Sequence, residues 1–191
     1  MRHIILLTIA AATSSTLAAA QIPRMNPGFE IRTFAGAYVP TGAQADDFKA
    51  ATTLGAALAR EVGEHMHLLG SLSWTHGHNK FAKLDDDRTY IWQYDAGVEI
   101  NALRELENGW LFRPLAGLGA GARTYDYAAT NVGTNTCTAA YANIGSEFQR
   151  NLVAVRVDGR YYLNCFKSPI SGAERTRHDL GFSLGLVYHI R

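Results

Sequence analysis

Apolar and polar residues alternate along most of this chain from Phe29 onward. In the clearest segment, 90–101, apolar side chains occupy every second position, and polar or small side chains fill the positions between them. A period of two is the pattern of a β-strand whose two faces meet different surroundings. The same alternation predicts eight strands, at about 29–39, 53–62, 66–75, 90–101, 110–123, 139–149, 153–163 and 179–190. The sequence therefore predicts an all-β protein.

The connections between these strands alternate in length. The turns at 63–64 and 150–152 are tight and 102–109 is moderate, whereas the other connections are longer and polar, at 40–52, 76–89, 126–138 and 164–177. Strands of about ten residues can cross a bilayer when tilted, and barrels of the bacterial outer membrane have short periplasmic turns and long extracellular loops. We therefore expect an eight-stranded antiparallel up-and-down transmembrane β-barrel in the bacterial outer membrane, with both termini on the periplasmic side.

The N-terminus has the pattern of an export signal. A basic start precedes an apolar core at 4–12, and small residues precede a cleavage site between Ala20 and Gln21. The apolar core is too short to span a bilayer as an anchor. We expect a signal peptide at 1–20 and one outer-membrane barrel domain at 21–191.

The two faces of the predicted strands differ in chemistry. One face carries charged side chains of both signs, namely Glu30, Arg32, Glu61, Asp95, Glu99, Arg113, Arg123, Glu147, Arg156, Asp158, Arg160 and Asp179. The other carries aromatic residues near strand ends, where rings favour the level of the lipid headgroups: Trp74, Tyr90, Trp92, Trp110, Phe112, Tyr161 and Tyr188. Side chains can just fill an eight-stranded barrel, and buried charges must be paired. We therefore predict a polar, ion-paired interior.

The turn near 151–152 also predicts a register. If it is a two-residue hairpin loop, Glu147 lies opposite Arg156. By the same register, Asn143 faces Arg160, and Gly145 makes room beside Asp158.

The two cysteines are Cys137 and Cys165. They lie almost symmetrically beyond the ends of the hairpin 139–163, and an exported protein folds in an oxidising compartment. Their positions are offset by one residue in strand parity, which a β-bulge or a bend in the loop could absorb. We predict a disulfide between them.

Candidate chemistry elsewhere in the chain is sparse. His65 and His67 could share a metal ion, but without further ligands we interpret them as a polar pair near a turn. Asp85–Asp87, following Lys80 and Lys83, could hold a divalent cation or contact lipopolysaccharide phosphates, and a solvated loop is the preferred interpretation. The predicted outward faces hold no convincing Ser-His pair for a lipid-modifying enzyme. We predict no catalytic residue, no cofactor and no metal.

Four segments resemble the outer-membrane β-barrel domain family, the small barrels typified by the OmpX and OmpA transmembrane domains. They are FRPLAGLGAGA from Phe112, YANIGSEF from Tyr141, VRVDGRYY from Val155 and LGLVYHIR from Leu184. The resemblance covers nearly all of the chain after the signal, and these four segments are its most family-like parts. The resemblance implies the same barrel fold.

Two further features follow from this resemblance. The inward alternation Arg156, Asp158, Arg160 is similar to the buried ionic cluster of such barrels. The last strand resembles the signal read by the barrel-assembly machinery, which we expect as a partner during insertion. That signal usually ends in an aromatic residue, whereas this chain ends in His189-Ile190-Arg191 with Tyr188 as the nearest aromatic residue.

Several functions remain open at this point. Eighteen Lys and Arg against 17 Asp and Glu give a formal net charge of +1, which argues against nucleic-acid binding. We expect a non-enzymatic barrel with a structural or surface-interaction role through its long loops, embedded in outer-membrane lipid and lipopolysaccharide, and monomeric because a closed barrel has no free edge. The alternatives are a narrow passive pore, a soluble lipocalin-like carrier and a lipid-modifying barrel enzyme.

Overall fold

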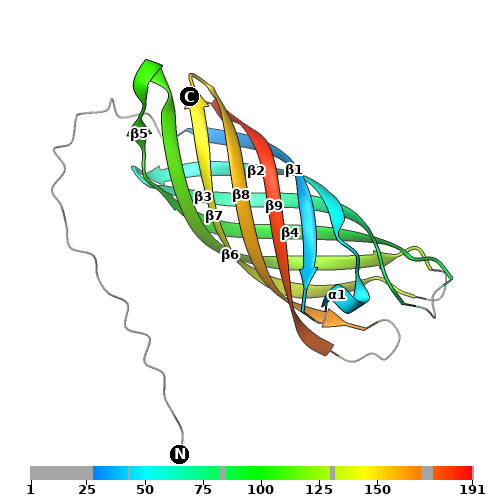
Figure 1. Ribbon diagram of the computed structural model, residues 1–191. Coiled ribbons are helices and arrows are strands. Elements are labelled where there is room, and N and C mark those ends of the chain that lie inside the picture. The colour runs from blue at the N-terminus through cyan, green and yellow to red at the C-terminus, as the bar shows by residue number, and fades with distance from the viewer. Residues whose placement is uncertain (1–27, 43, 82–84, 130–131, 169–173, 191) are drawn as a thin grey trace, which may run out of the picture.

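The described residues form a closed antiparallel barrel of eight long strands (Figure 1). This computed structural model describes residues 28–42, 44–81, 85–129, 132–168 and 174–190, so the predicted signal peptide at 1–20 lies outside the described residues. The long strands are β1 (Phe29–Thr41), β2 (Ala51–Gly63), β3 (Met66–His78), β4 (Arg88–Asn101), β6 (Leu111–Tyr127), β7 (Asn135–Arg150), β8 (Val153–Lys167) and β9 (Glu174–Ile190).

Each long strand pairs with the next one along the chain, and β1 pairs with β9 to close the cylinder. This arrangement confirms the predicted up-and-down barrel. Three short elements lie in the connections: α1 (Gln44–Asp47), β5 (Arg104–Glu105) and the 3-10 turn η1 (Glu107–Gly109). Among the described residues, no helix is long and apolar enough to cross a membrane.

The turn between β7 and β8 fixes the register that the sequence predicts. Arg150 pairs with Val153, so only two residues form the loop, and the first of them, Asn151, has a φ of 58°. Asparagine tolerates this left-handed conformation, which tight hairpins require. In the resulting ladder Glu147 is opposite Arg156, which confirms the predicted register.

The strands at the long-loop end extend further than the alternation predicts. β6 continues to Tyr127, β7 already begins at Asn135, β8 continues to Lys167 and β9 begins at Glu174. Backbone hydrogen bonds between strands do not require an apolar outer face, so the ladder continues where the outward side chains become polar. The connections predicted at 126–138 and 164–177 are therefore shorter than expected.

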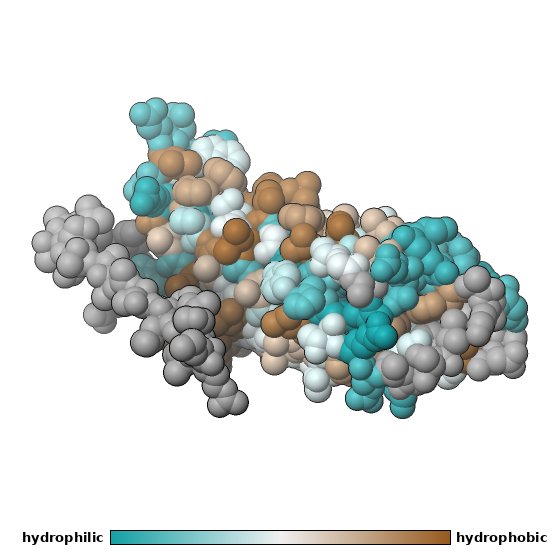
Figure 2. Space-filling view, turned by 60° about the horizontal axis from the view of Figure 1, so that its bottom comes forward, coloured by the Kyte–Doolittle hydropathy of each residue, from teal (hydrophilic) through white to brown (hydrophobic). Residues whose placement is uncertain are grey.

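The outer surface of the barrel is apolar. Leu118, Ile144 and Phe182 have 66%, 72% and 53% of their surface exposed. Figure 2 shows hydrophobic side chains gathered over the middle of the barrel and hydrophilic ones toward its ends. Soluble proteins rarely expose so large an apolar area, whereas a membrane barrel presents it to lipid. A lipocalin-like carrier, which needs its apolar face inside, is excluded by this arrangement.

Aromatic side chains lie toward both ends of this apolar surface. On β3 and β4 the Trp74 ring centroid is 6.1 Å from that of Tyr90 and 6.5 Å from that of Trp92. Near the short-turn end, the rings of Phe112 and Phe148 are 5.0 Å apart. Rings at these two levels suit the two interfaces between hydrocarbon and headgroups.

Glycines on the inner face make room for a large side chain. The ring of Tyr141 lies over Gly119, and its hydroxyl lies over Gly97, so a Cβ atom at either position would overlap it. At Gly119 a Cβ would also overlap the carbonyl oxygen of Ala96. The inner wall formed by β4 and β6 therefore depends on the absence of side chains at these positions.

The predicted disulfide is not formed. Cys137 and Cys165 are both free thiols. Cys137 packs inward against the aromatic cluster at the barrel mouth, while Cys165 lies between the buried residues Asn164 and Phe166 and so points outward. The one-residue offset in parity persists because the described β6–β7 ladder runs through Cys137 without a bulge. The Cys137 thiol donates to the backbone carbonyl of Cys165 instead of bonding to its sulfur.

Substituting Gly119→Ala should destabilise the barrel by roughly 1–3 kcal/mol, because the added methyl group overlaps Tyr141 and the β4 backbone. The urea midpoint of the protein refolded in detergent measures this change. Gly63→Ala is the matched control, since nothing lies within 4 Å of a Cβ atom at Gly63. Equal midpoints for both variants would contradict the packing described here.

Protein purified without reductant should react with two equivalents of maleimide once unfolded, because Cys137 and Cys165 are both free. A reduced sample provides the reference for complete labelling. Labelling that requires prior reduction would show that the two strand ends rearrange to join the sulfurs.

Candidate functional site: the ion-paired lumen and its closed mouth

The lumen near the short turns holds a cluster of acids, histidines and one arginine. Glu30 Oε1 accepts from Arg113 Nη1 at 2.9 Å and lies 3.1 Å from His67 Nε2. The imidazole of His189 lies between two carboxylates, with Nδ1 3.2 Å from Glu30 Oε1 and Nε2 3.2 Å from Glu147 Oε1. Both glutamates are buried, so their negative charge is balanced within the lumen rather than by water.

A second group of ion pairs is centred on Glu99, deeper in the lumen. Arg32 donates to Glu99 at 2.6 Å and to Glu30 at 2.7 Å, which joins this group to the first. Arg156 Nη1 donates to Glu99 Oε2 at 3.1 Å, and Asn143 Nδ2 donates to Glu99 Oε1 at 3.0 Å. Glu99 therefore accepts from three strands, β1, β7 and β8.

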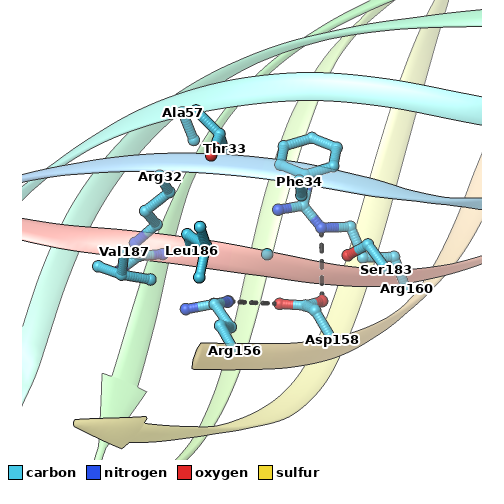
Figure 3. Close-up of a pocket in the computed structure, with 11 residues that line it drawn as sticks. Arg32, Thr33, Phe34, Ala57, Arg156, Asp158, Arg160, Ser183, Leu186 and Val187 are labelled. Atoms are coloured by element: carbon cyan, nitrogen blue, oxygen red, sulfur yellow. Dashed lines mark hydrogen bonds and ion pairs between the residues drawn. The ribbon is translucent and has the colours of Figure 1, made fainter. Parts of the chain in front are cut away.

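Asp158 and Asp95 extend the network toward the long-loop end. Arg156 and Arg160 both point at Asp158, as Figure 3 shows, with Arg160 Nε 3.5 Å from Asp158 Oδ1. Arg160 Nη1 is also 3.6 Å from Asp95 Oδ2. The network thus crosses the lumen repeatedly between β4 and β8.

The charged layer beneath the long-loop end of the barrel is formed by Arg123, which donates to Asp179 across the lumen. Arg123 also donates to Gln93 Oε1, and its guanidinium lies 4.8 Å from the centroid of the Tyr162 ring. Asn164 donates to Asp179 at 2.6 Å. Every group in this layer is buried, with Asp179 completely inaccessible.

An aromatic cluster closes the lumen beyond this layer. Phe48 has its ring centroid 5.7 Å from that of Tyr125, 5.6 Å from that of Phe166 and 5.9 Å from that of Phe81. It is only 2% exposed because α1, at the end of the barrel in Figure 1, brings it into the mouth. We call residues 44–48 the plug segment.

Polar contacts hold the plug segment in place. Gln44 is fully buried, and its Nε2 donates to the Tyr38 hydroxyl at 2.9 Å. Asp47 forms an ion pair with Arg177 of β9, and the Asp47 carbonyl accepts from the Lys80 backbone amide at 2.7 Å. Two strands, β1 and β9, and a neighbouring loop therefore hold the plug segment through polar contacts.

Small cavities remain between these layers. One of about 20 Å³ lies beside Arg32, Arg156 and Asp158, among the residues drawn in Figure 3. Another of about 40 Å³ lies beside Tyr38, Gln93 and Arg123. These volumes fit one or a few water molecules.

The structure brings the predicted polar residues into one lumen but gives them different partners. Glu30, Arg32, Glu99, Arg113, Glu147, Arg156, Asp158, Arg160 and Asp179 all point inward along their strands. Glu147 contacts Arg113 and His189 rather than its cross-strand neighbour Arg156, which reaches Glu99. Register fixes neighbours within the wall, whereas the charges pair across the lumen.

Sequence reasoning missed the plug segment and the role of two histidines. Phe48 lay in a connection predicted to be polar, and a single aromatic residue there was the only signal. His189 shares the inward parity of Asp179, which could have indicated its place. The predicted polar pair of His65 and His67 is separated, because His67 is buried in the lumen while His65 is exposed in the turn.

The acidic loop residues have local partners. Arg88 donates to Asp86 at 2.6 Å, and these hydrogen bonds lower the pKa of Asp86 to about 2. Asp87 lies 3.1 Å from His78 Nδ1, and Lys80 donates to the Ala45 carbonyl at 2.6 Å. Lys83 lies outside the described residues. Asp86, Asp87 and Lys80 therefore each have a partner within the described residues.

No family model and no curated protein sequence matches this chain. Among solved structures, the crystal structure of Neisserial surface protein A is similar with a TM-score of 0.57 and 11% identity, covering 84% of this chain and 96% of that one. The attachment invasion locus protein Ail of Yersinia pestis is similar with a TM-score of 0.51 and 14% identity, covering 87% of this chain and 100% of that one.

Both similarities concern the fold, which they cover almost completely. The apolar exterior and charged interior are features of this chain itself, and they require the barrel to lie in lipid. The chain has eight antiparallel strands in sequential order, and its apolar exterior surrounds a charged interior. Together with these structural similarities, this identifies its fold as that of a small eight-stranded β-barrel of the bacterial outer-membrane type.

Proposed function

We propose that this protein is a closed, non-enzymatic outer-membrane barrel that acts through its extracellular rim in a structural or surface-interaction role. The observation that carries the proposal is the closed mouth, where Phe48 packs among Tyr125, Phe166 and Phe81 above the Arg123–Asp179 pair. A barrel whose lumen is closed in this way supports loops rather than conducting solutes.

The layered ion pairs support closure independently of the plug segment. A solute crossing the lumen would have to separate Arg123 from Asp179, Arg160 from Asp95 and Arg156 from Glu99. Removing a buried charge from its partner is strongly unfavourable. The two cavities described above hold no more than a few waters, which disfavours the alternative of a passive pore.

The outward histidines support a non-enzymatic role. Covalent catalysis needs a nucleophile within reach of a base that activates it. His178 Nδ1 lies 2.5 Å from the Tyr161 hydroxyl, and His78 Nδ1 lies 3.1 Å from Asp87. His76 stacks on Tyr90 with ring centroids 5.2 Å apart. Tyr161 and His178 have the residue types of a nucleophile and a base, but their rings also pack against each other with centroids 5.8 Å apart. We therefore assign this pair to an interfacial aromatic surface rather than to catalysis.

The rim that remains for interaction consists of the extended strand ends and loops. Lys167 and Glu174 lie where β8 and β9 leave the apolar zone, and both are exposed. We propose outer-membrane lipid and lipopolysaccharide as the surroundings of this rim and the barrel-assembly machinery as the partner during insertion. The chain should act as a monomer because the closed ladder offers no free strand edge.

The refolded protein should show no steady conductance in a planar bilayer, since the plug segment and the ion-pair layers each close the lumen. Phe48→Ala should remain silent as well, because Arg123 and Asp179 still block the path. Regular unitary currents from the wild-type protein would instead favour the passive pore.

Replacing Glu99→Gln should lower the free energy of unfolding by about 3–5 kcal/mol, because Arg32 and Arg156 lose their shared buried partner. Urea unfolding followed by gel mobility without boiling measures the loss. Glu105→Gln, which removes a carboxylate from the exposed strand β5, is the matched control. A Glu99→Gln barrel as stable as this control would show that the network does not hold the lumen.

A further inference from the structure

Side chains of metal-ligating type meet at the short-turn end of the lumen. One carboxylate oxygen each of Glu30 and Glu147 and one ring nitrogen of His189 lie within 4.8 Å of one another. They come from β1, β7 and β9, and His67 of β3 lies beside them with Nε2 3.1 Å from Glu30 Oε1. We propose that Glu30, Glu147 and His189 bind a divalent transition-metal ion of the zinc class.

Glu147 supplies a second and independent observation. Its side chain is completely buried, yet Oε2 has no hydrogen-bond partner among the described residues. A buried carboxylate oxygen without a partner is costly and calls for an unseen one. His189 Nε2 faces this carboxylate, 3.2 Å from Glu147 Oε1. The Glu147 carboxylate therefore keeps unused ligand capacity beside an imidazole nitrogen.

The donor set selects the class of ion. Zinc binds imidazole nitrogen and carboxylate oxygen at similar distances and accepts three protein ligands plus a water or a fourth side chain. Imidazole ligands disfavour magnesium and calcium, which prefer oxygen. Two carboxylates and a neutral imidazole would also match the double positive charge of the ion. His67 is the nearest candidate for a fourth ligand.

Arg113 competes with the ion for the same oxygens. Its Nη1 lies 2.9 Å from Glu30 Oε1 and 3.4 Å from Glu147 Oε1, so a tethered cation already faces both carboxylates. The rest of this side chain is weakly held, because among the described residues Nε has no hydrogen-bond partner and Nη2 donates to Gln149 Oε1 at 3.3 Å. Arg113 can therefore move toward Gln149, and its displacement limits the affinity for metal.

The position of the cluster gives the ion a route into the lumen and links its binding to the closure of the barrel. The side chains of His189 and Arg113 are 12% and 11% exposed at the turn end, whereas Glu30 and Glu147 behind them are inaccessible or nearly so. An ion entering there would join β1 to β9, the two strands that close the barrel, and also to β7. Binding to the folded state alone would stabilise this closure.

Titration calorimetry with Zn²⁺ alone tests the proposal on the mature protein in detergent micelles, purified with a tag that contains no histidine. The wild-type protein should bind one ion. Glu147→Gln and His189→Asn should each weaken binding about tenfold or more, and Arg113→Met should strengthen it by a similar factor because the competing cation is gone. His76→Asn, which removes an outward histidine of β3, is the matched control and should bind as the wild type does.

Several results would contradict the proposed metal site. Absence of saturable Zn²⁺ binding to the wild type, or binding that Glu147→Gln and His189→Asn leave unchanged, overturns the proposal. Gel mobility before boiling reports whether each variant is folded. If the ligand variants do not fold, Arg113→Met decides, since unchanged or weaker affinity in that variant would show that the ion binds elsewhere. Displacement of Zn²⁺ by equimolar Mg²⁺ would contradict the imidazole ligand.

Discussion

The closure of β1 onto β9 is the constraint on which the rest of this structure depends. Hydrocarbon offers no hydrogen bonds, so every backbone amide and carbonyl of a spanning segment must find its partner in the protein. The ladder between the first and last strands runs along all 13 residues of β1 and leaves no open edge. Because closure is cylindrical, each strand must have one face in lipid and one in the lumen, and the alternation along the sequence follows from this.

The small number of strands then determines the character of the interior. An eight-stranded lumen is narrow enough for side chains from opposite walls to touch. Glu99 on β4 meets Arg156 on β8, 57 residues away in the sequence, and Arg32 on β1. Such charges can be buried only because each acid meets a base across the lumen. The ion pairs are thus a consequence of closure as well as a support for it.

The sequence predicts the wall of the barrel better than its contents. Strand number, strand order and the register of β7 on β8 follow from alternation and from the two-residue loop at Asn151, because these are local properties. The partner of Glu147 does not follow, since His189 and Arg113 approach it from other strands. No local pattern encodes which charges meet across the lumen, although parity does show which residues point into it.

The errors at the loop end have a related cause. Alternation of polarity marks only the part of a strand that lies in lipid. The sequence pattern therefore did not predict that β6 continues to Tyr127 or that β9 begins at Glu174. Parity alone already opposed a bond between Cys137 and Cys165, and the ladder has no bulge there to overcome it. Phe48 turns inward because Tyr125 and Phe166 offer it an apolar surface that only the assembled barrel creates.

The division between wall, lumen and rim separates side chains that hold several strands together from side chains that do not. A lumen side chain such as Arg123 contacts Asp179, Gln93 and the Tyr162 ring at once, so its replacement disturbs several strands. A rim side chain such as Lys167 ends a strand whose backbone partners are already satisfied. Under the function proposed above, substitutions at the rim can therefore alter interactions with other molecules at little cost to the barrel.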